Sequence, residues 1–151
     1  MNQYTPVAAL EHDSHSCTRG AFFIGSLYPF DMNEITSALK IEPTYFWLQT
    51  KEWLKDVPNF PQATWGYELP GFEYETIDKP TNDILDIFLP LRNIIIPFVE
   101  KYALSTSIDV LINICESDSC SSVECVLRYE TIKRIHEMGA SFQITPRFRF
   151  E

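Results

Sequence analysis

Few residues of this sequence have the types and spacing that chemistry requires. His12, His15 and Cys17 are spaced like possible metal ligands. A structural zinc site usually draws on recognisable paired motifs, however, and a fourth ligand would have to come from another part of the chain. We therefore expect no metal at these residues, and we interpret residues 1–16 as a poorly ordered polar tail.

The remaining cysteines and the last histidine give no stronger indication of a site. Cys115, Cys120 and Cys125 contain no Cys-x-x-Cys pair, so we interpret them as reduced thiols of a cytosolic protein. His136 is the only histidine outside the N-terminal tail, and it lies in a predicted helix. We expect it at the surface or at a boundary, without a role as a general base.

Sequence motifs for the common enzyme and cofactor classes are absent. The chain has no glycine-based phosphate loop, no Walker lysine motif and no His-Glu-x-x-His metal motif. It also has no positioned serine motif and no carboxylate pair with an evident cleft. We therefore expect a protein that is not an enzyme and that has no cofactor and no bound metal.

The charge of the chain indicates which partners it repels. Lysine and arginine number 12 against 21 aspartates and glutamates, for a net charge of −9. This charge disfavours nucleic acid and anionic membranes, and it would attract a basic protein partner. The alternative is that the acidic residues only keep the protein soluble. No apolar run approaches the ~20 residues of a membrane span, and a secretory signal pattern is absent, so we expect a cytoplasmic protein.

Carboxylates and aromatic residues are interleaved between residues 60 and 78, and we predict a partner-binding surface there. Aromatic side chains would anchor the interface, while carboxylates would raise the rate of association with a basic partner. The alternative is that the aromatic residues belong to a strand pair and its core. We favour the core for Trp65 and Tyr67, and both interpretations stay open for the other two aromatic residues, at positions 72 and 74. The predicted surface consists of Phe60, Glu68, Phe72, Glu73, Tyr74, Glu75 and Asp78.

The clearest structural unit is a strand, a helix and a second strand in the first third of the chain. Residues 19–27 carry large apolar groups on both faces, which is typical of an interior strand. Asp31 can cap the following helix, with Glu34 as the second half of a capping box. The helix should end near Lys40, and a strand through residues 45–47 completes the unit.

Hydrophobic periodicity predicts the remaining elements. Alternation indicates strands over residues 63–69 and 107–115, a hairpin partner over 123–127 and a last strand over 142–150. A helical stripe runs over residues 81–103, either as one curved helix or as two helices meeting near Pro90. Another helix, over residues 129–138, ends at Gly139. Its inward residues are predicted to be Tyr129, Ile132, Ile135 and Met138.

These elements together predict a single α+β domain over residues 17–151. We expect a mostly antiparallel sheet of about five or six strands, with one long and two shorter helices packed on it. A chain of this length buries about 70% of the surface that its unfolded form exposes, so it needs no disulfide.

A set of structural motifs runs through the domain: a strand rich in Phe and Ile, an Asp-x-x-Glu-Ile helix, a Leu-x-Ile-x-Pro-Thr exit, a Trp-x-x-x-Leu strand and a terminal helix ending in Gly before the last strand. From the helix onward, they occupy residues 31–35, 39–44, 65–69, 130–139 and 142–148. Together they resemble the bacterial family catalogued as domain of unknown function 4279, over most of the chain from about residue 19 onward. The segment between residues 55 and 80 departs from the family pattern because it is longer, aromatic and acidic.

The resemblance implies a fold, and it brings no established catalytic residues to this chain. Members of the family resemble, in size and genomic setting, the immunity proteins that neutralise bacterial toxins. The resemblance therefore implies a non-enzymatic binding protein, in the first place an immunity protein that binds a basic toxin domain directly. The alternative is a small-ligand-binding or regulatory module whose concave sheet face accepts a metabolite.

Overall fold

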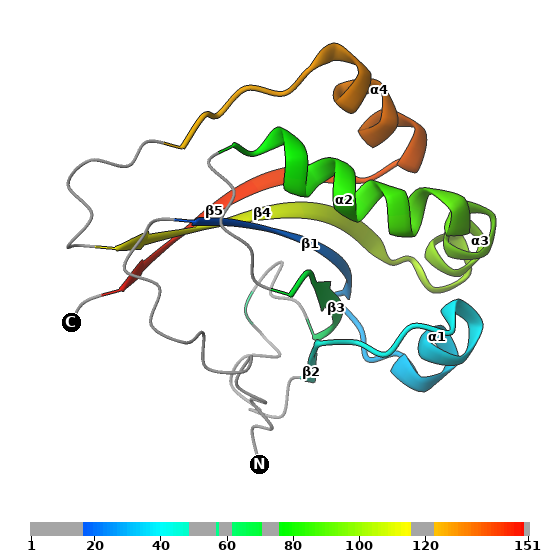
Figure 1. The fold of residues 1–151 in the computed structure, drawn as a ribbon. Coiled ribbons are helices and arrows are strands. Elements are labelled where there is room, and N and C mark those ends of the chain that lie inside the picture. Colours follow the sequence, from blue (N-terminus) through cyan, green and yellow to red (C-terminus); the bar gives the residue numbers. More distant parts are fainter. Residues whose placement is uncertain (1–16, 49–56, 58–61, 71–75, 116–122, 150–151) are drawn as a thin grey trace.

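The computed structural model of the chain is an α+β fold with its helices gathered on one side of a sheet (Figure 1). It describes residues 17–48, 57, 62–70, 76–115 and 123–149. The strands of these residues are β1 (Cys17–Ser26), β2 (Tyr45–Leu48), β3 (Ala63–Glu68), β4 (Ser105–Cys115) and β5 (Ser141–Arg149). They form one sheet in the order β2-β3-β1-β4-β5, in which β4 and β5 run parallel and all other neighbours run antiparallel. The predicted fold class, a mostly antiparallel α+β sheet, is confirmed.

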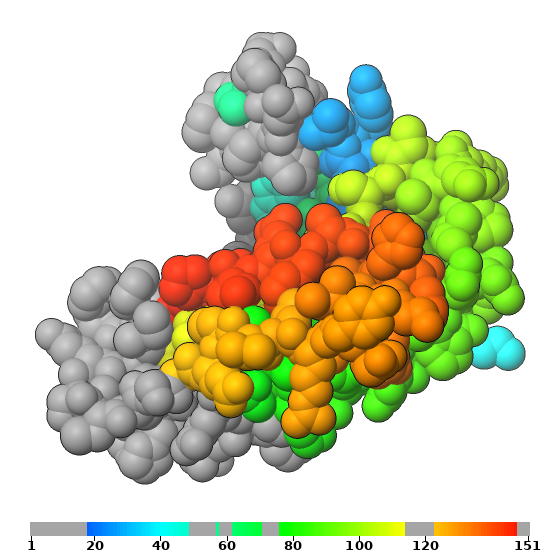
Figure 2. All heavy atoms as spheres, turned by 90° about the horizontal axis from the view of Figure 1, so that it is seen from above, coloured from blue at the N-terminus to red at the C-terminus, as the bar shows by residue number. Residues whose placement is uncertain are grey.

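The helices of the described residues form one long and two shorter segments. α1 (Met32–Leu39) and α4 (Tyr129–Met138) are single helices, while α2 (Asp78–Phe88), the 3-10 turn η2 (Leu89–Leu91) and α3 (Arg92–Tyr102) follow one another without a break. α2 packs on β1 and β4, α4 packs on α2, and α1 packs on α3. Figure 2 shows this layer from above, with α4 in orange beside the green of α2. The predicted number and relative length of the helices are confirmed.

The long helical segment combines both shapes that the sequence allows. Pro90 lies in η2, where its missing amide hydrogen interrupts α-helical bonding and one turn tightens to 3-10 geometry. In Figure 1, α3 then leaves the line of α2. Pro97 lies inside α3, which continues to Tyr102. Two α-helices therefore meet near Pro90, and helical turns connect them throughout.

The core lies between the sheet and the helices. Phe22 of β1 stacks on Phe88 of α2 with ring centroids 4.2 Å apart, and Trp65 of β3 packs edge-on against the same Phe88 ring. β1 approaches α2 closely at Gly20, where a Cβ atom would lie 2.4 Å from the carbonyl oxygen of Pro80. Because β1 lies between β3 and β4, it is the interior strand that its sequence predicts.

The predicted cap of α1 is confirmed, but the predicted capping box is wrong. The Asp31 side chain accepts a hydrogen bond from the Asn33 amide at 2.9 Å, and the helix ends at Lys40 in the left-handed conformation. Glu34 does not reach back to the cap. Its Oε2 atom accepts a hydrogen bond from the Tyr102 hydroxyl at 2.5 Å. Glu34 therefore ties α1 to α3, because a tertiary donor competes successfully for the carboxylate that the motif assigns to the cap.

The predicted hairpin between β4 and residues 123–127 is wrong. β4 pairs with β1 along one edge and with β5 along the other, so both rows of its backbone groups are occupied. The described residues of the 123–127 segment form one isolated bridge, between Glu124 and Thr76. Hydrophobic alternation predicted β4 correctly but carries no information about the neighbours of a strand, which here come from distant parts of the chain.

On α4, two of the four residues predicted to face inward are buried and two are exposed. The buried pair is Ile135 and Met138, and the exposed pair is Tyr129 and Ile132. Thr131 is buried as well, because its hydroxyl donates a hydrogen bond to Asp78 Oδ1 on α2 at 2.7 Å. The buried side of α4 therefore includes Thr131 together with Ile135 and Met138. Gly139 ends the helix with φ of 69°, as predicted.

Candidate functional site

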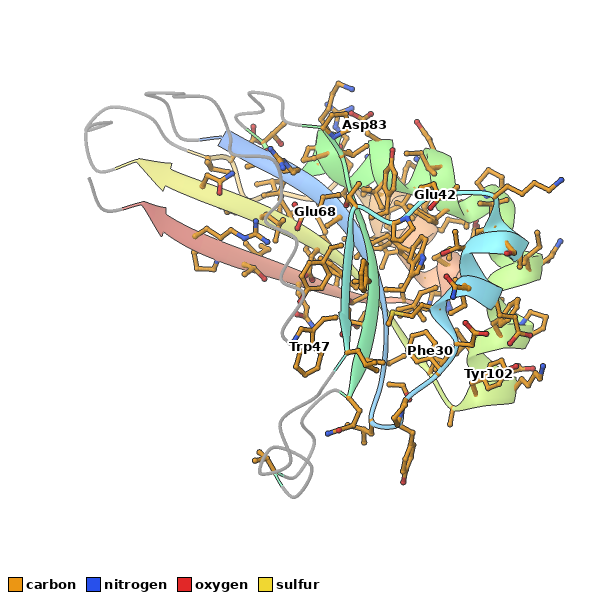
Figure 3. All side chains as sticks on the ribbon, turned by 90° about the horizontal axis from the view of Figure 1, so that it is seen from below. Phe30, Glu42, Trp47, Glu68, Asp83 and Tyr102 are labelled. Atoms are coloured by element: carbon orange, nitrogen blue, oxygen red, sulfur yellow. The ribbon has the colours of Figure 1, made fainter. Side chains whose placement is uncertain are left out.

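The face of the sheet that points away from α2 is polar. The buried apolar residues Phe22 and Ile24 of β1 and Ile108 and Val110 of β4 point to the helices, so their neighbours along each strand point the opposite way. Figure 3 looks onto this face, with α4 behind the sheet and α1 beside it. Ala21 of β1 pairs with Glu68 of β3 on one side and with Asp109 of β4 on the other, so the two carboxylate side chains flank a small residue. The polar residues of this face include Arg19, Thr64, Glu68, Ser105, Ser107, Asp109, Gln143 and Arg147.

A pocket of about 530 Å³ opens on this polar face. Small-molecule sites commonly have volumes of roughly 300–1,000 Å³. Part of the lining is aromatic, with Phe23 of β1 and Tyr45 of β2. Gly25 also lines the pocket, and the nearest atoms to a Cβ atom placed there would be 3.8 Å away, so a small side chain would fit at this end of β1 without a clash. The charged lining residues are Glu68, Asp109 and Arg147.

Glu68 is the centre of an ion-pair cluster at one end of the pocket. Its Oε2 atom lies 3.5 Å from Nη1 of Arg19, and its Oε1 atom accepts a hydrogen bond from Nη2 of Arg147 at 3.2 Å. The side chains of Arg19 and Glu68 are 6% and 2% exposed, whereas that of Arg147 is 42% exposed. The cluster therefore joins β1, β3 and β5 on the polar face and leaves Arg147 at the rim.

Asp109 is buried in the lining without a complete set of partners. It is 8% exposed, and among the residues that the structure describes, its Oδ1 atom has no hydrogen-bond partner. Burial raises the pKa of Asp109 above its usual value, the positive charge of Arg147 opposes this shift, and the negative charge of Glu68 adds to it. In the same part of the chain, Nε of Arg19 and Oε2 of Glu68 also lack hydrogen-bond partners. Folded proteins contain few such atoms because their burial is unfavourable, so these atoms mark the least satisfied polar groups of this face.

The aromatic part of the pocket depends on a glycine. A Cβ atom at Gly66 of β3 would lie 2.5 Å from the Phe23 ring, so only a glycine lets that ring rest on β3. Tyr45 meets Phe23 edge-on, with ring centroids 6.0 Å apart and an interplanar angle of 86°. The two rings therefore form an apolar wall beside the polar groups.

The structure separates the two described residues of the predicted partner-binding surface. Glu68 is buried in the ion-pair cluster of the polar face. Asp78 begins α2, in the helical layer, where its Oδ1 atom accepts hydrogen bonds from the Arg128 amide at 2.9 Å and the Thr131 hydroxyl at 2.7 Å. Burial alone would raise the pKa of Asp78, but these hydrogen bonds outweigh it and the pKa lies below its usual value. The other predicted surface residues lie outside the described residues, namely Phe60, Phe72, Glu73, Tyr74 and Glu75.

The other candidates from the sequence lie outside the pocket. His136 is exposed on α4, as predicted, and Cys125 is an exposed free cysteine. His12 and His15 lie outside the described residues. Within the described ranges, no group of three or more histidine, cysteine, aspartate or glutamate residues could hold a metal ion. None of the helices in these ranges is long and apolar enough to cross a membrane.

The sequence prediction did not include Arg19, Asp109 or Arg147 as site residues. A charged residue near the middle of a strand that is otherwise apolar is the signal that could have found Asp109, because interior strands bury both faces. Arg19 stands at the start of the predicted strand, where a charged residue gives no such signal. Their convergence with Glu68 depends on strand order and register, which are not visible in the local sequence.

Comparison with known proteins identifies the family of the chain. Residues 18–148 match a family described as a domain of unknown function (DUF4279). No curated protein and no solved structure matches the chain. The match begins in β1, ends in β5 and covers most of the sequence, and the chain therefore belongs to the DUF4279 family.

Proposed function

We propose that this protein binds a small ligand in the pocket on the polar face of its sheet and performs no chemistry on it. The observation that supports this most directly is Asp109, a buried carboxylate in the pocket lining whose Oδ1 atom has no hydrogen-bond partner among the described residues. A bound ligand would supply the missing donor. An aromatic wall beside a few convergent polar groups is also typical of small-molecule sites.

The composition of the lining supports binding more than catalysis. The described residues that line the pocket include no histidine, cysteine or lysine, the side chains that supply most general bases and many nucleophiles. Glu68 is engaged by two arginines, which hold its carboxylate in place. Such a site orients a ligand by fixed hydrogen bonds and apolar contact.

A pair of tryptophan substitutions on β5 tests whether ligands enter this pocket. Gln143 lines the pocket, whereas its neighbour Ile144 points to the other side of the sheet, and both are exposed. Fragments from a mixed library that bind the wild-type protein, detected by NMR, should lose binding to Gln143→Trp and keep it with Ile144→Trp. A library without a single binder, or binders that ignore Gln143→Trp, would contradict the proposal.

The second candidate function is direct binding of a basic protein, most concretely a toxin domain that this chain would neutralise as an immunity protein. The net charge of −9 favours this candidate. Several carboxylates are exposed on the described helices and so remain available to such a partner, among them Glu130 and Glu137. Carboxylates of this kind raise association rates with a basic surface.

Charge reversal within residues 60–78 tests this second candidate. The tagged protein would be purified from its native host, and the association rate of an identified partner would be measured at low salt. Replacing both Glu73 and Glu75 by lysine should slow that association and leave the melting temperature nearly unchanged. Unchanged association at low salt would contradict the predicted surface.

A further inference from the structure

We infer that the ligand of the pocket is an organic cation, an ammonium or guanidinium group on an apolar stem, whose charged head pairs with Asp109 and whose stem lies against Phe23 and Tyr45. This inference rests on the proposed function, because it assigns a chemical class to the ligand of the same pocket.

The four charged residues of the polar face differ in how completely their side chains are hydrogen-bonded and paired. This difference indicates which charge a ligand of the pocket should carry. Arg19 and Arg147 both direct a guanidinium nitrogen at the Glu68 carboxylate, at 3.5 Å and 3.2 Å. Asp109 receives no hydrogen bond at Oδ1 from the described residues. Of the three buried atoms without a hydrogen-bond partner in the described part of the chain, two are carboxylate oxygens, Oδ1 of Asp109 and Oε2 of Glu68, and the third, Nε of Arg19, belongs to a guanidinium group that is already paired with Glu68. Asp109 is therefore the carboxylate that a ligand would satisfy, and a donor that is also positive would supply both a hydrogen bond and a balancing charge.

The surroundings of Asp109 strengthen this preference. Glu68 lies across Ala21 from Asp109, so its negative charge disfavours an ionised Asp109 and would favour a cation placed between them. Arg147 is the one cation that opposes this effect, and it is already bonded to Glu68. A ligand ammonium or guanidinium would replace the solvation that burial removes from the Asp109 carboxylate.

The aromatic wall of Phe23 and Tyr45 provides the surface on which the apolar stem of the ligand would pack. Phe23 lies over Gly66, and Tyr45 meets it edge-on, so the pocket offers an apolar surface next to the carboxylate. An alkyl or aryl stem would bury its surface there, and a cation close to an aromatic face gains further attraction. A metal ion fits less well, because hard cations need six or more oxygen ligands and no cluster of three or more acidic, histidine or cysteine residues exists in the described part of the chain.

The test uses three probes that share a phenyl stem and differ in charge: phenethylamine, phenethyl alcohol and hydrocinnamate. Dissociation constants would be measured by NMR titration of the full chain. The amine should bind about tenfold or more tightly than the alcohol, the usual effect of a hydrogen bond to a charged group. Asp109→Asn keeps the shape of the side chain. In this variant the dissociation constants of the amine and the alcohol should differ by no more than about twofold. Glu100→Gln, an exposed change on α3, should leave the difference intact.

Other outcomes separate this inference from the proposed function. Tightest binding by hydrocinnamate, through Arg147 at the rim, or equal binding of all three probes would overturn the inference while ligand binding in the pocket stands. Retention of the amine preference in Asp109→Asn would also overturn it. Phe23→Leu should weaken all three probes alike, because their stem is common, and this variant keeps the test valid if Asp109→Asn folds poorly.

The same cationic chemistry could come from a free amine or from the side chain of a lysine in a protein. A capped peptide with one lysine between glycines distinguishes these sources. Binding of phenethylamine without binding of the peptide assigns the pocket to a small molecule. Peptide binding that depends on Asp109 assigns it to a basic polypeptide, and failure of both in a protein that binds other fragments at Gln143 overturns the inference.

Discussion

The two faces of the sheet differ in how completely their polar groups are paired. In the helical layer, the Trp65 indole donates a hydrogen bond to Thr36 Oγ1 at 3.0 Å, and Asp78 accepts hydrogen bonds from α4. On the polar face, buried atoms of Arg19, Glu68 and Asp109 lack hydrogen-bond partners among the described residues. The helical face is thus arranged for stability, while the polar face retains an energetic cost that a ligand would relieve.

Two glycines on the same strand give the largest predicted difference between the faces. A Cβ atom at Gly20, on the helical face, would lie 2.4 Å from the Pro80 carbonyl oxygen and 2.7 Å from Ile84 Cγ1. Gly20→Ala should therefore lower the free energy of unfolding by about 3 kcal/mol, since α2 must move. Gly25→Ala, on the polar face, should change it by less than about 0.5 kcal/mol. Urea denaturation of both variants measures the difference, and equal midpoints would show that α2 does not pack closely on β1.

Asp78 tests whether the polar groups of the helical layer are stabilising. Asp78→Ala removes acceptors for the Arg128 amide and the Thr131 hydroxyl and should cost about 2 kcal/mol of unfolding free energy. Because the pKa of Asp78 is lowered on folding, its ionisation stabilises the protein above the unfolded pKa, and this stability is lost as pH falls through the folded pKa. The variant should therefore lose less stability on acidification than the wild-type protein. The control is Asp86→Ala, which removes the pair between Arg134 and an Asp86 side chain that is 67% exposed, and it should cost only about 0.3 kcal/mol.

The helical face could be predicted from the sequence, and the polar face could not. Phe22 and Ile24 on β1 and Ile108 and Val110 on β4 are large apolar residues at every second position, and this period is a direct consequence of burial against helices. The site depends instead on register: Glu68 and Asp109 meet because both strands pair with Ala21. Local periodicity contains no information on such pairing, which explains the missed β4–β5 pair and the missed pocket.

At Gly66 the polar face is packed as closely as the helical face is at Gly20. Gly66→Ala would place a Cβ atom 2.5 Å from the Phe23 ring, which is half-buried and can move. We expect a loss of about 1 kcal/mol in unfolding free energy, smaller than for Gly20→Ala because a ring yields more easily than a backbone. Displacement of Phe23 should also weaken phenethylamine binding. Unchanged binding in a folded Gly66→Ala variant would show that the aromatic wall does not contact the stem.

The smallest predicted effect is a gain in stability on the polar face. Asp109→Asn removes a buried negative charge that faces Glu68 of β3 and Arg147 of β5, with Arg19 of β1 behind Glu68. We expect the free energy of unfolding to rise at neutral pH by less than about 1 kcal/mol. Because the wild-type pKa is raised on folding, the stability linked to the protonated carboxyl is present below the unfolded pKa and is lost as pH rises through the folded pKa. The advantage of the asparagine should therefore grow as pH rises from acid to neutral, and chemical denaturation at several pH values measures this trend. A variant that is destabilised at neutral pH would mean that Asp109 is already satisfied by a cation, so that the two faces do not differ as proposed.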